Sequence, residues 1–323
     1  MTSPRSTRSS GDLRVVVLAG GLSHERDVSV RSGRRVAGAL RSTGVDVVVH
    51  DVDADLVPTL RELEPDVVWP LLHGATGEDG SVREILDLLG VPYVGTGPAA
   101  SRVAWNKEIA KGVVARAGIS TPDSVTLQQD LFRELGAGSV MQAIVDRIGL
   151  PLVVKPSRGG SALGVSVVTE RGDLARALVA SYAYGDAALV ERAVTGTEIA
   201  VSVVETDDGP VALPAVEIVT DGPYDYDARY NPGRSQYFTP ARLDAETTER
   251  AADAAVTAFR ELGLRHLGRV DLIVDQDGVP HFLETNVAPG MTETSLFPQA
   301  AVASGTTLAA IYRDIVERAA DGR

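Results

Sequence analysis

Residues 13–21 of the chain read Leu-Arg-Val-Val-Val-Leu-Ala-Gly-Gly, an apolar run that ends in two glycines. Such a run is typical of a strand buried on both faces, as in a parallel sheet covered by helices. The glycine pair indicates a turn directly after the strand. This stretch therefore predicts an α/β fold that begins with a buried strand.

The residues that follow continue the alternation of strand and helix. We expect a helix from about Ser29 to Ser42, strands at Asp46–Val52 and Asp66–Leu72, and a helix at Val82–Leu89. Strands that alternate with helices pair in parallel through crossover connections. Residues 13–97 therefore predict an N-terminal domain with a Rossmann-like parallel sheet.

Two further α/β domains are expected, a central one over residues 98–188 and a C-terminal one over residues 189–323. For the central domain, the pattern predicts helices at Ser101–Ala117 and Leu131–Ile148 and strands at Leu152–Lys155 and Val165–Val168. For the C-terminal domain, it predicts strands at Ala188–Glu191, Glu198–Glu205, Val211–Val219, Gly268–Val274 and His281–Thr285, and helices at Ala245–Leu262 and Thr307–Ala319.

Composition excludes several classes of protein. The 323 residues carry 31 basic and 44 acidic side chains, a net charge of −13, so a nucleic-acid partner is not expected. Cysteine is absent, which excludes disulfides, Cys-ligated metals and a thiol nucleophile. Residues 1–12 predict a disordered polar tail rather than a secretory signal. The longest uncharged stretch, Thr294–Tyr312, contains Pro298 and Gly305, so we expect a cytoplasmic protein with no membrane partner.

Lysine is rare in this chain. Of 31 basic residues only Lys107, Lys111 and Lys155 are lysine, and the other 31 − 3 = 28 are arginine. Lys111 is expected to have no special role. Lys155 opens a glycine-rich turn that ends at Gly164, where backbone N–H groups and a lysine can converge on phosphate. An ordinary hairpin loop is the alternative interpretation of this turn.

A hairpin near the C-terminus carries the strongest chemical signal. Asp271 lies on an apolar strand, and the return strand ends in Glu284-Thr-Asn286. Depending on register, residue 271 lies opposite residue 282 or residue 284, and either arrangement brings the three side chains together. Two carboxylates and an amide oxygen are ligands that suit Mg²⁺ bound to nucleotide phosphates. Arg269 adjoins this patch and could stabilise an oxyanion.

Other turns give weaker signals. Glu25 follows the first strand, at the edge where open α/β sheets bind ligands, although it could simply favour the N-terminus of the next helix. His73 ends another strand on the same side, and we assign it no base role. The chain has no P-loop, no G-x-S-x-G elbow and no H-E-x-x-H helix.

Five motifs in order resemble the D-alanine–D-alanine ligases of the ATP-grasp superfamily, over about residues 13–320. They are His73-Gly-x-x-Gly-Glu-Asp-Gly80, Lys155-Pro-Ser-Arg-x-Gly-Ser161, Tyr224-Asp-Tyr-x-Ala-x-Tyr230, Gln236-Tyr-Phe-x-Pro240 and Glu284-x-Asn-x-x-Pro-Gly-Met-Thr292. The resemblance implies three α/β domains with ATP between the central and C-terminal ones. It also implies a reaction in which ATP phosphorylates one D-alanine and the amine of a second D-alanine attacks, for peptidoglycan precursors.

The resemblance also implies roles for individual residues. The catalytic and substrate-binding set is Glu25, Ser161, Tyr230, Arg269, Gly290 and Ser295. The ATP-binding set is Lys107, Lys155, Glu191, Arg192, Val194, Glu198, Arg229 and Leu283. Asp271, Glu284 and Asn286 would hold two Mg²⁺ ions, for which Mn²⁺ could substitute. A homodimer is expected from the resemblance alone.

Some positions depart from the family pattern. Gly159 stands where Glu is usual, Ala162 where Ser is usual, and Val287-Ala288 where Thr-Ser is usual. These changes leave the identity of the second substrate open. The alternative is a related ATP-grasp ligase that joins other amino or hydroxy acids in a biosynthetic pathway.

Overall fold

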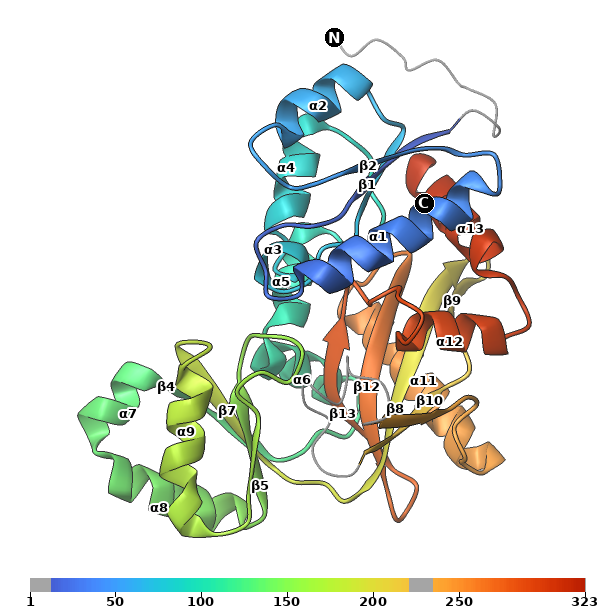
Figure 1. Ribbon diagram of the computed structural model, residues 1–323. Coiled ribbons are helices and arrows are strands. Elements are labelled where there is room, and N and C mark those ends of the chain that lie inside the picture. The colour runs from blue at the N-terminus through green and yellow to red at the C-terminus, as the bar shows by residue number, and fades with distance from the viewer. Residues whose placement is uncertain (1–12, 221–234, 323) are drawn as a thin grey trace.

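The computed structural model describes residues 13–220 and 235–322, and its three sheets are surrounded by helices (Figure 1). The expected tail at residues 1–12 lies outside the described residues.

The N-terminal sheet is parallel, as the sequence predicts, and its strand order is β2-β1-β3. Val15, Val16, Val17 and Leu18 of the first strand are fully buried because helices cover both faces of the sheet. The elements are β1 (Arg14–Leu18), α1 (Arg26–Arg41), β2 (Asp46–His50), α2 (Leu56–Leu63), β3 (Val67–Pro70), α3 (Ala75–Glu78) and α4 (Ser81–Leu89).

The central sheet is antiparallel, with strand order β4-β7-β5-β6. The single helix expected at Leu131–Ile148 is wrong, because Gly136 takes φ of +83° and separates two helices. β4 and α9 were not predicted. The elements are β4 (Ser124–Gln128), α7 (Gln129–Leu135), α8 (Ala137–Ile148), β5 (Leu152–Pro156), β6 (Ser166–Val168), the short helix η1 (Arg171–Asp173), α9 (Leu174–Tyr182) and β7 (Ala187–Arg192).

The helix expected at Ser101–Ala117 is also two helices, α5 (Pro98–Trp105) and α6 (Lys107–Arg116). Asn106 between them is extended, and its side chain accepts a hydrogen bond from the Ile109 N–H at 3.2 Å. This is an N-cap, and it places Lys107 at the first position of a helix. Both helices pack on β13 of the C-terminal sheet, and the expected domain boundaries remain predictions.

The C-terminal sheet has strand order β11-β10-β8-β12-β13, with β9 also paired to β8. The single strand expected at Val211–Val219 is wrong, because Leu213-Pro214-Ala215 separates β9 from β10. The elements are β8 (Gly196–Thr206), β9 (Gly209–Ala212), β10 (Val216–Thr220), β11 (Ser235–Phe238), α11 (Ala245–Glu261), β12 (Leu267–Asp275), β13 (Pro280–Asn286), α12 (Leu296–Ala303) and α13 (Leu308–Ala320).

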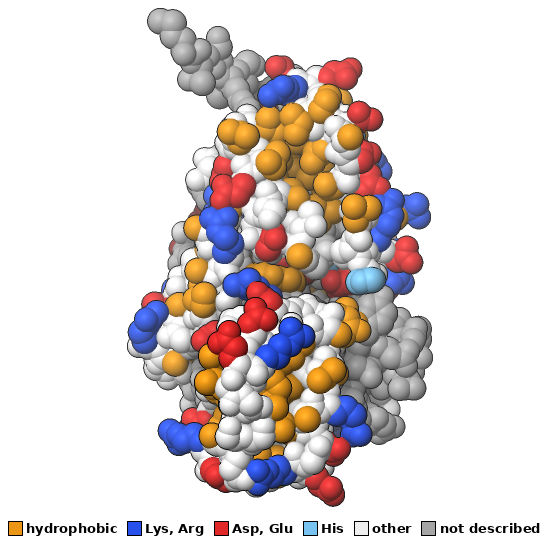
Figure 2. Space-filling model, turned by 90° about the vertical axis from the view of Figure 1, so that its left-hand side faces the viewer, with side chains coloured by type: hydrophobic (Ala, Val, Ile, Leu, Met, Phe, Trp, Pro, Cys, Tyr) orange, Lys and Arg blue, Asp and Glu red, His pale blue; other side chains and the backbone are white. Residues whose placement is uncertain are grey.

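The two ends of the described chain pack together. α13 lies beside α1 next to the N-terminal sheet (Figure 1), and the Trp69 and Tyr312 rings meet edge to face at 5.3 Å. One hydrophobic cluster therefore spans the first and last elements, which holds the N-terminal sheet over the C-terminal one. Figure 2 shows hydrophobic side chains gathered over the upper part of one face. Among the exposed hydrophobic side chains are Ile85 and Leu88 of α4, exposed by 39% and 81%. No helix among the described residues is both long enough and apolar enough to span a bilayer.

Candidate active site

Two cavities adjoin where the three sheets meet. The larger, about 1010 Å³ including its opening, lies between the central and C-terminal sheets. The smaller, about 820 Å³ including its opening, lies between the N-terminal and C-terminal sheets. Lys107, Gly159, Gly160 and Glu284 line both, so ligands in the two cavities would meet there.

Most residues of the predicted ATP-binding set line the larger cavity. Apolar side chains of both sheets form the rest of its wall, as is usual for a small-molecule site. The predicted residues that it brings together are Lys107, Lys155, Glu191, Arg192, Val194, Glu198, Leu283, Asp271 and Glu284.

A buried network of three charges lies at this cavity. Lys155 Nζ is 2.5 Å from one Glu191 carboxylate oxygen, and Lys111 Nζ is 2.6 Å from the other. Burial alone would raise the pKa of Glu191, but the two ammoniums hold it below its usual value. Lys111 also donates to the Pro122 carbonyl at 2.9 Å. Sequence analysis assigned Lys111 no role, yet it fixes the carboxylate that pairs with Lys155.

Lys107 connects the glycine-rich turn to the hairpin. Its Nζ donates to the Gly159 carbonyl at 2.6 Å and lies 3.1 Å from a Glu284 oxygen. Its backbone N–H donates to the Ser157 carbonyl at 3.0 Å. Two hydrogen bonds from Lys107 therefore hold the glycine-rich turn, one to the Ser157 carbonyl and one to the Gly159 carbonyl.

The hairpin brings the predicted metal ligands together. A bulge between Asp271 and Leu272 places Asp271 directly opposite Glu284, so the alternative register with residue 282 is wrong. Arg269 donates to both Asp271 oxygens, at 2.7 and 2.8 Å. Asn286 lies opposite Arg269, and its side-chain oxygen accepts the Ala288 N–H at 2.8 Å.

These oxygen donors fit a hard divalent cation, because two carboxylates from neighbouring strands face each other with an amide oxygen nearby. Among residues 13–220 and 235–322, no three acidic or histidine side chains gather closely enough to hold a metal ion. The expected metal site therefore needs the amide oxygen of Asn286 and the phosphate oxygens of a bound nucleotide as further ligands.

Most of the predicted catalytic set lines the smaller cavity. Ser161, in a left-handed turn with φ of 52°, donates a hydrogen bond to Glu25 of the N-terminal region. Ser295 Oγ accepts the Thr292 N–H at 3.0 Å, and a Cβ at residue 290 would lie only 2.8 Å from that oxygen. The predicted residues that the cavity brings together are Glu25, Ser161, Arg269, Gly290 and Ser295.

Two further residues of this cavity were not predicted. Glu78 is buried, and burial together with repulsion from Glu25 raises its pKa to about 8. His73 is also buried, and burial lowers its pKa. Its Nε2 finds no hydrogen-bond partner among the described residues. Tyr230 and Arg229 of the predicted sets lie outside the described residues.

Comparison with known proteins is decisive. Residues 58–96 match the family model of the D-Ala–D-Ala ligase N-terminus, and residues 113–317 match that of the C-terminus. The chain belongs to the D-alanine–D-alanine ligase family. It is 42% identical to the D-alanine–D-alanine ligase of Desulforudis audaxviator, over 94% of this chain and 96% of that protein. It is 40% identical to that of Gloeobacter violaceus, over 96% of this chain and all of that protein.

Solved structures of this ligase family share the fold. The D-alanine–D-alanine ligase of Bacillus anthracis aligns with a TM-score of 0.81 at 30% identity, over 96% of this chain and 98% of that chain. Its structure complexed with ATP aligns at 0.79, with 30% identity over 95% and 97%. VanG D-Ala:D-Ser ligase of Enterococcus faecalis aligns at 0.82, with 27% identity over 95% and 99%. The predicted ATP-grasp fold is confirmed, and the chain is an ATP-binding ligase.

Proposed function

We propose that this ligase joins two D-alanines to D-alanyl-D-alanine for peptidoglycan precursor synthesis, with ATP as the energy source. One observation carries the proposal: the two cavities meet at Lys107 and Glu284. A nucleotide in the larger cavity would direct its terminal phosphate toward a carboxylate held in the smaller one. That geometry suits phosphoryl transfer to a carboxylate, in which positioning and charge stabilisation supply the catalysis.

In this proposal the larger cavity holds ATP. Lys107 and Lys155 carry the positive charges for its phosphates. Burial would lower the pKa of Lys155, but attraction to Glu191 and Glu284 raises it, so the ammonium stays charged at neutral pH. Glu191, Val194 and Glu198 bind the adenine edge and the ribose, and Arg192, Arg229 and Leu283 complete the nucleotide site.

We propose that Asp271, Glu284 and Asn286 hold two Mg²⁺ ions, with Mn²⁺ as a possible substitute. When bound, such ions neutralise phosphate charge and polarise the phosphoryl group. Before metal binds, Arg269 and Lys107 neutralise the two carboxylates of this set. The cations of the protein thus keep the hairpin stable in the absence of metal.

The smaller cavity supplies both amino-acid subsites. Glu25 pairs with the ammonium of the first D-alanine. The carboxylate of that D-alanine then attacks the terminal phosphorus of ATP, which breaks the bond to ADP and leaves an acyl phosphate. The second D-alanine, whose carboxylate Ser295 contacts, loses a proton from its ammonium to solvent, and the resulting amine attacks the acyl carbon. Arg269 and the Gly290 N–H stabilise the resulting oxyanion, and inorganic phosphate leaves. Ser161, with Tyr230, would complete a hydrogen-bonded set around Glu25.

The fold is also compatible with a different second substrate, because VanG D-Ala:D-Ser ligase has a similar fold. Ala162 lines the larger cavity, and the carbonyl of Gly159 contacts Lys107, so two of the departures from the family pattern lie near the reacting groups. A ligase that joins another amino or hydroxy acid is therefore the second candidate function.

The test measures ADP release with Mg²⁺ and a panel of D- and L-amino acids, D-serine and D-lactate, with products weighed by mass spectrometry. We expect ADP, phosphate and D-alanyl-D-alanine only when D-alanine and Mg²⁺ are both present. Turnover with L-amino acids and none with D-alanine would contradict the main proposal. Predominant mixed product or ester at pH 7 would favour the second candidate.

We further propose a cytoplasmic homodimer whose partners are D-alanine and ATP, with no nucleic acid and no membrane. A net charge of −13 supports the exclusion of nucleic acid. Light scattering of the purified protein tests the dimer. Its elution from a heparin column tests the proposed lack of a polyanion-binding site.

A further inference from the structure

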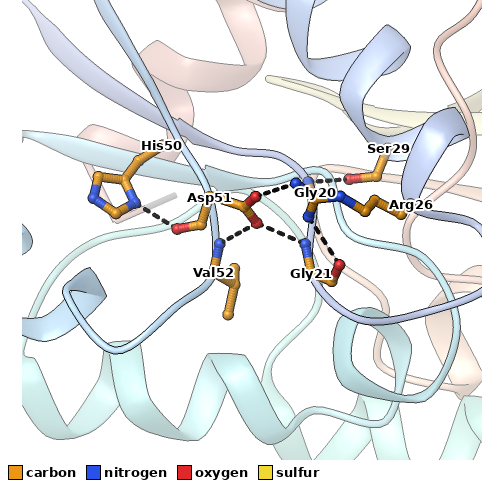
Figure 3. Close-up of polar contacts among 7 residues, drawn as sticks. All are labelled: Gly20, Gly21, Arg26, Ser29, His50, Asp51 and Val52. Carbon is orange, nitrogen blue, oxygen red and sulfur yellow. Dashed lines mark hydrogen bonds and ion pairs between the residues drawn. The ribbon is translucent and has the colours of Figure 1, made fainter.

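A second polar cluster lies outside both cavities, at the carboxyl ends of β1 and β2 (Figure 3). Asp51, the residue after β2, turns its carboxylate into the Gly20-Gly21 loop. One oxygen accepts the N–H groups of Gly21 and Val52, both at 2.7 Å, and the other accepts a guanidinium N–H of Arg26 at 2.6 Å. The three donors converge on one carboxylate, as they would on a bound anion.

The backbone of the Gly20-Gly21 loop packs closely around this carboxylate. Gly20 takes φ of +126°, and a Cβ there would lie 2.1 Å from the nearer Asp51 oxygen. Any side chain at Gly20 would therefore displace the carboxylate. Open α/β folds bind ligands at this edge of the sheet. Here the Asp51 carboxylate occupies that position.

The same contacts fix the path of the chain toward Glu25. Arg26 also donates to the Gly21 carbonyl at 2.9 Å, so one guanidinium joins the start of the loop to Asp51. Ser29, one turn into α1, accepts the Gly20 N–H at 2.8 Å and donates to the Leu71 carbonyl at 2.6 Å. Residues 20–29 are thus held at both ends.

Glu25 lies between these anchors. It directly precedes Arg26, it is buried, and its carboxylate accepts the Ser161 hydroxyl from the glycine-rich turn. The loop is otherwise held by short local bonds, such as Glu25 N–H to Ser23 Oγ at 2.9 Å. The anchors at Asp51 and Ser29 therefore help to set the position of Glu25 relative to the cavity, together with the Ser161 contact.

We infer that Asp51 and Arg26 form a clamp that positions Glu25 for the first amino-acid substrate. Neither residue lines the cavity, so both are positioning residues rather than catalytic ones. The inference rests on the role proposed for Glu25 in binding the substrate ammonium. A displacement of about 1 Å at a reacting group can lower a rate about a hundredfold, so a modest movement of this loop is enough to be measured.

The charge and the backbone contacts of Asp51 can be tested separately. Asp51→Asn keeps an oxygen for the Gly21 and Val52 N–H groups but loses the ion pair with Arg26. Asp51→Ala loses both. Asp53→Asn is the matched control, because Asp53 is exposed and its carboxylate accepts the local Asp55 N–H. We expect Asp51→Ala to have the largest effect, Asp51→Asn a smaller one and the control Asp53→Asn the smallest.

The first readout is amide hydrogen exchange of residues 20–29 in the ligand-free full chain. We expect exchange at Gly21 to rise about tenfold in Asp51→Ala and to stay at the wild-type rate in the control. This readout needs no activity, so it tests the clamp even where the proposed function fails. Unchanged exchange in Asp51→Ala would overturn the inference.

The second readout is steady-state kinetics with D-alanine. We expect Asp51→Ala to raise the KM of the first D-alanine about tenfold, in the manner of Glu25→Gln, while the Kd of Mg-ATP without D-alanine changes less than twofold. An equal loss in ATP and D-alanine binding with a lower Tm would show a merely structural role and overturn the inference. So would faster loop exchange with an unchanged KM. A wild-type protein with no D-alanine turnover would instead refute the proposed function.

Discussion

The buried network of Lys155, Glu191 and Lys111 allows a quantitative test. Glu191 is 2% exposed and its two oxygens contact the two ammoniums at 2.5 and 2.6 Å. Glu191→Gln keeps the shape but leaves two buried positive charges without a counter-charge. Removing one partner of a buried ion pair costs about 3–5 kcal/mol. Because the glutamine oxygen still accepts one hydrogen bond, we expect a loss of about 3 kcal/mol in the free energy of unfolding.

The assay is thermal and guanidinium unfolding of the ligand-free protein. A loss of about 3 kcal/mol lowers the Tm of a chain this size by about 4–5 °C. Glu84→Gln is the matched control, because Glu84 pairs with Arg102 at 2.7 Å on the surface and such pairs contribute about 0–1 kcal/mol.

A second substitution tests the sign of the interaction. Lys111→Met leaves the Lys155–Glu191 pair intact, so we expect a smaller loss, about 1–2 kcal/mol. In the Glu191→Gln background the same substitution removes a repelling charge, and the double variant should unfold at a higher temperature than Glu191→Gln alone. A double variant that is less stable than Glu191→Gln, or a Glu191→Gln loss below about 1 kcal/mol, would refute this reasoning.

Three further outcomes are expected. Glu284→Gln removes the counter-charge that lies 3.1 Å from the buried Lys107 ammonium, so it should melt below the wild-type temperature without Mg²⁺. It should also lose the stabilisation by Mg-ATP, and near-wild-type turnover would show that the metal assignment is wrong. Glu78, with its pKa raised to about 8, stabilises the fold fully below its ordinary value of 4.5 and loses that contribution as pH rises toward 8. The free energy of unfolding of Glu78→Gln should therefore rise relative to that of the wild type from pH 5 to 9. If the two proteins lost stability equally over this range, Glu78 would not be a buried neutral acid. Gly77→Ala places a Cβ 2.0 Å from the Leu72 carbonyl oxygen and should lower the free energy of unfolding by about 3 kcal/mol. Gly138→Ala, which has open space around the added Cβ, should be neutral in the same unfolding assay. Equal effects of the two substitutions would count against the close packing at Gly77.

Much of the fold could be predicted from the sequence because burial leaves a strong local pattern. The run at residues 13–19 is apolar at nearly every position, and it forms the middle strand of the N-terminal sheet, covered on both faces. Helix interruptions were harder to predict. Asn106 and Gly136 end one helix and begin the next, yet either residue also occurs inside a helix pattern, and only the chain path shows which applies.

The candidate site was predicted where its residues are close in sequence and missed where they are not. Asp271 and Glu284 share a hairpin, but the bulge that pairs them depends on the packing of β12 between two neighbours, so the register stayed open. Lys111 has no local signal, because its partner Glu191 lies 80 residues away. Glu78 stands in a recognised motif, yet its burial requires contacts from the other regions of the fold.

The glycine-rich turn has a consequence for the affinities of the two ligands. Gly159 and Gly160 face both cavities, and the turn is tied to Lys107 on one side and through Ser161 to Glu25 on the other. A nucleotide in one cavity and an amino acid in the other would therefore contact the same short segment from opposite sides. By thermodynamic linkage, the factor by which either ligand changes the affinity of the other must be the same in both directions. If both substrates bind as proposed, the turn would thus couple them before any bond between them forms.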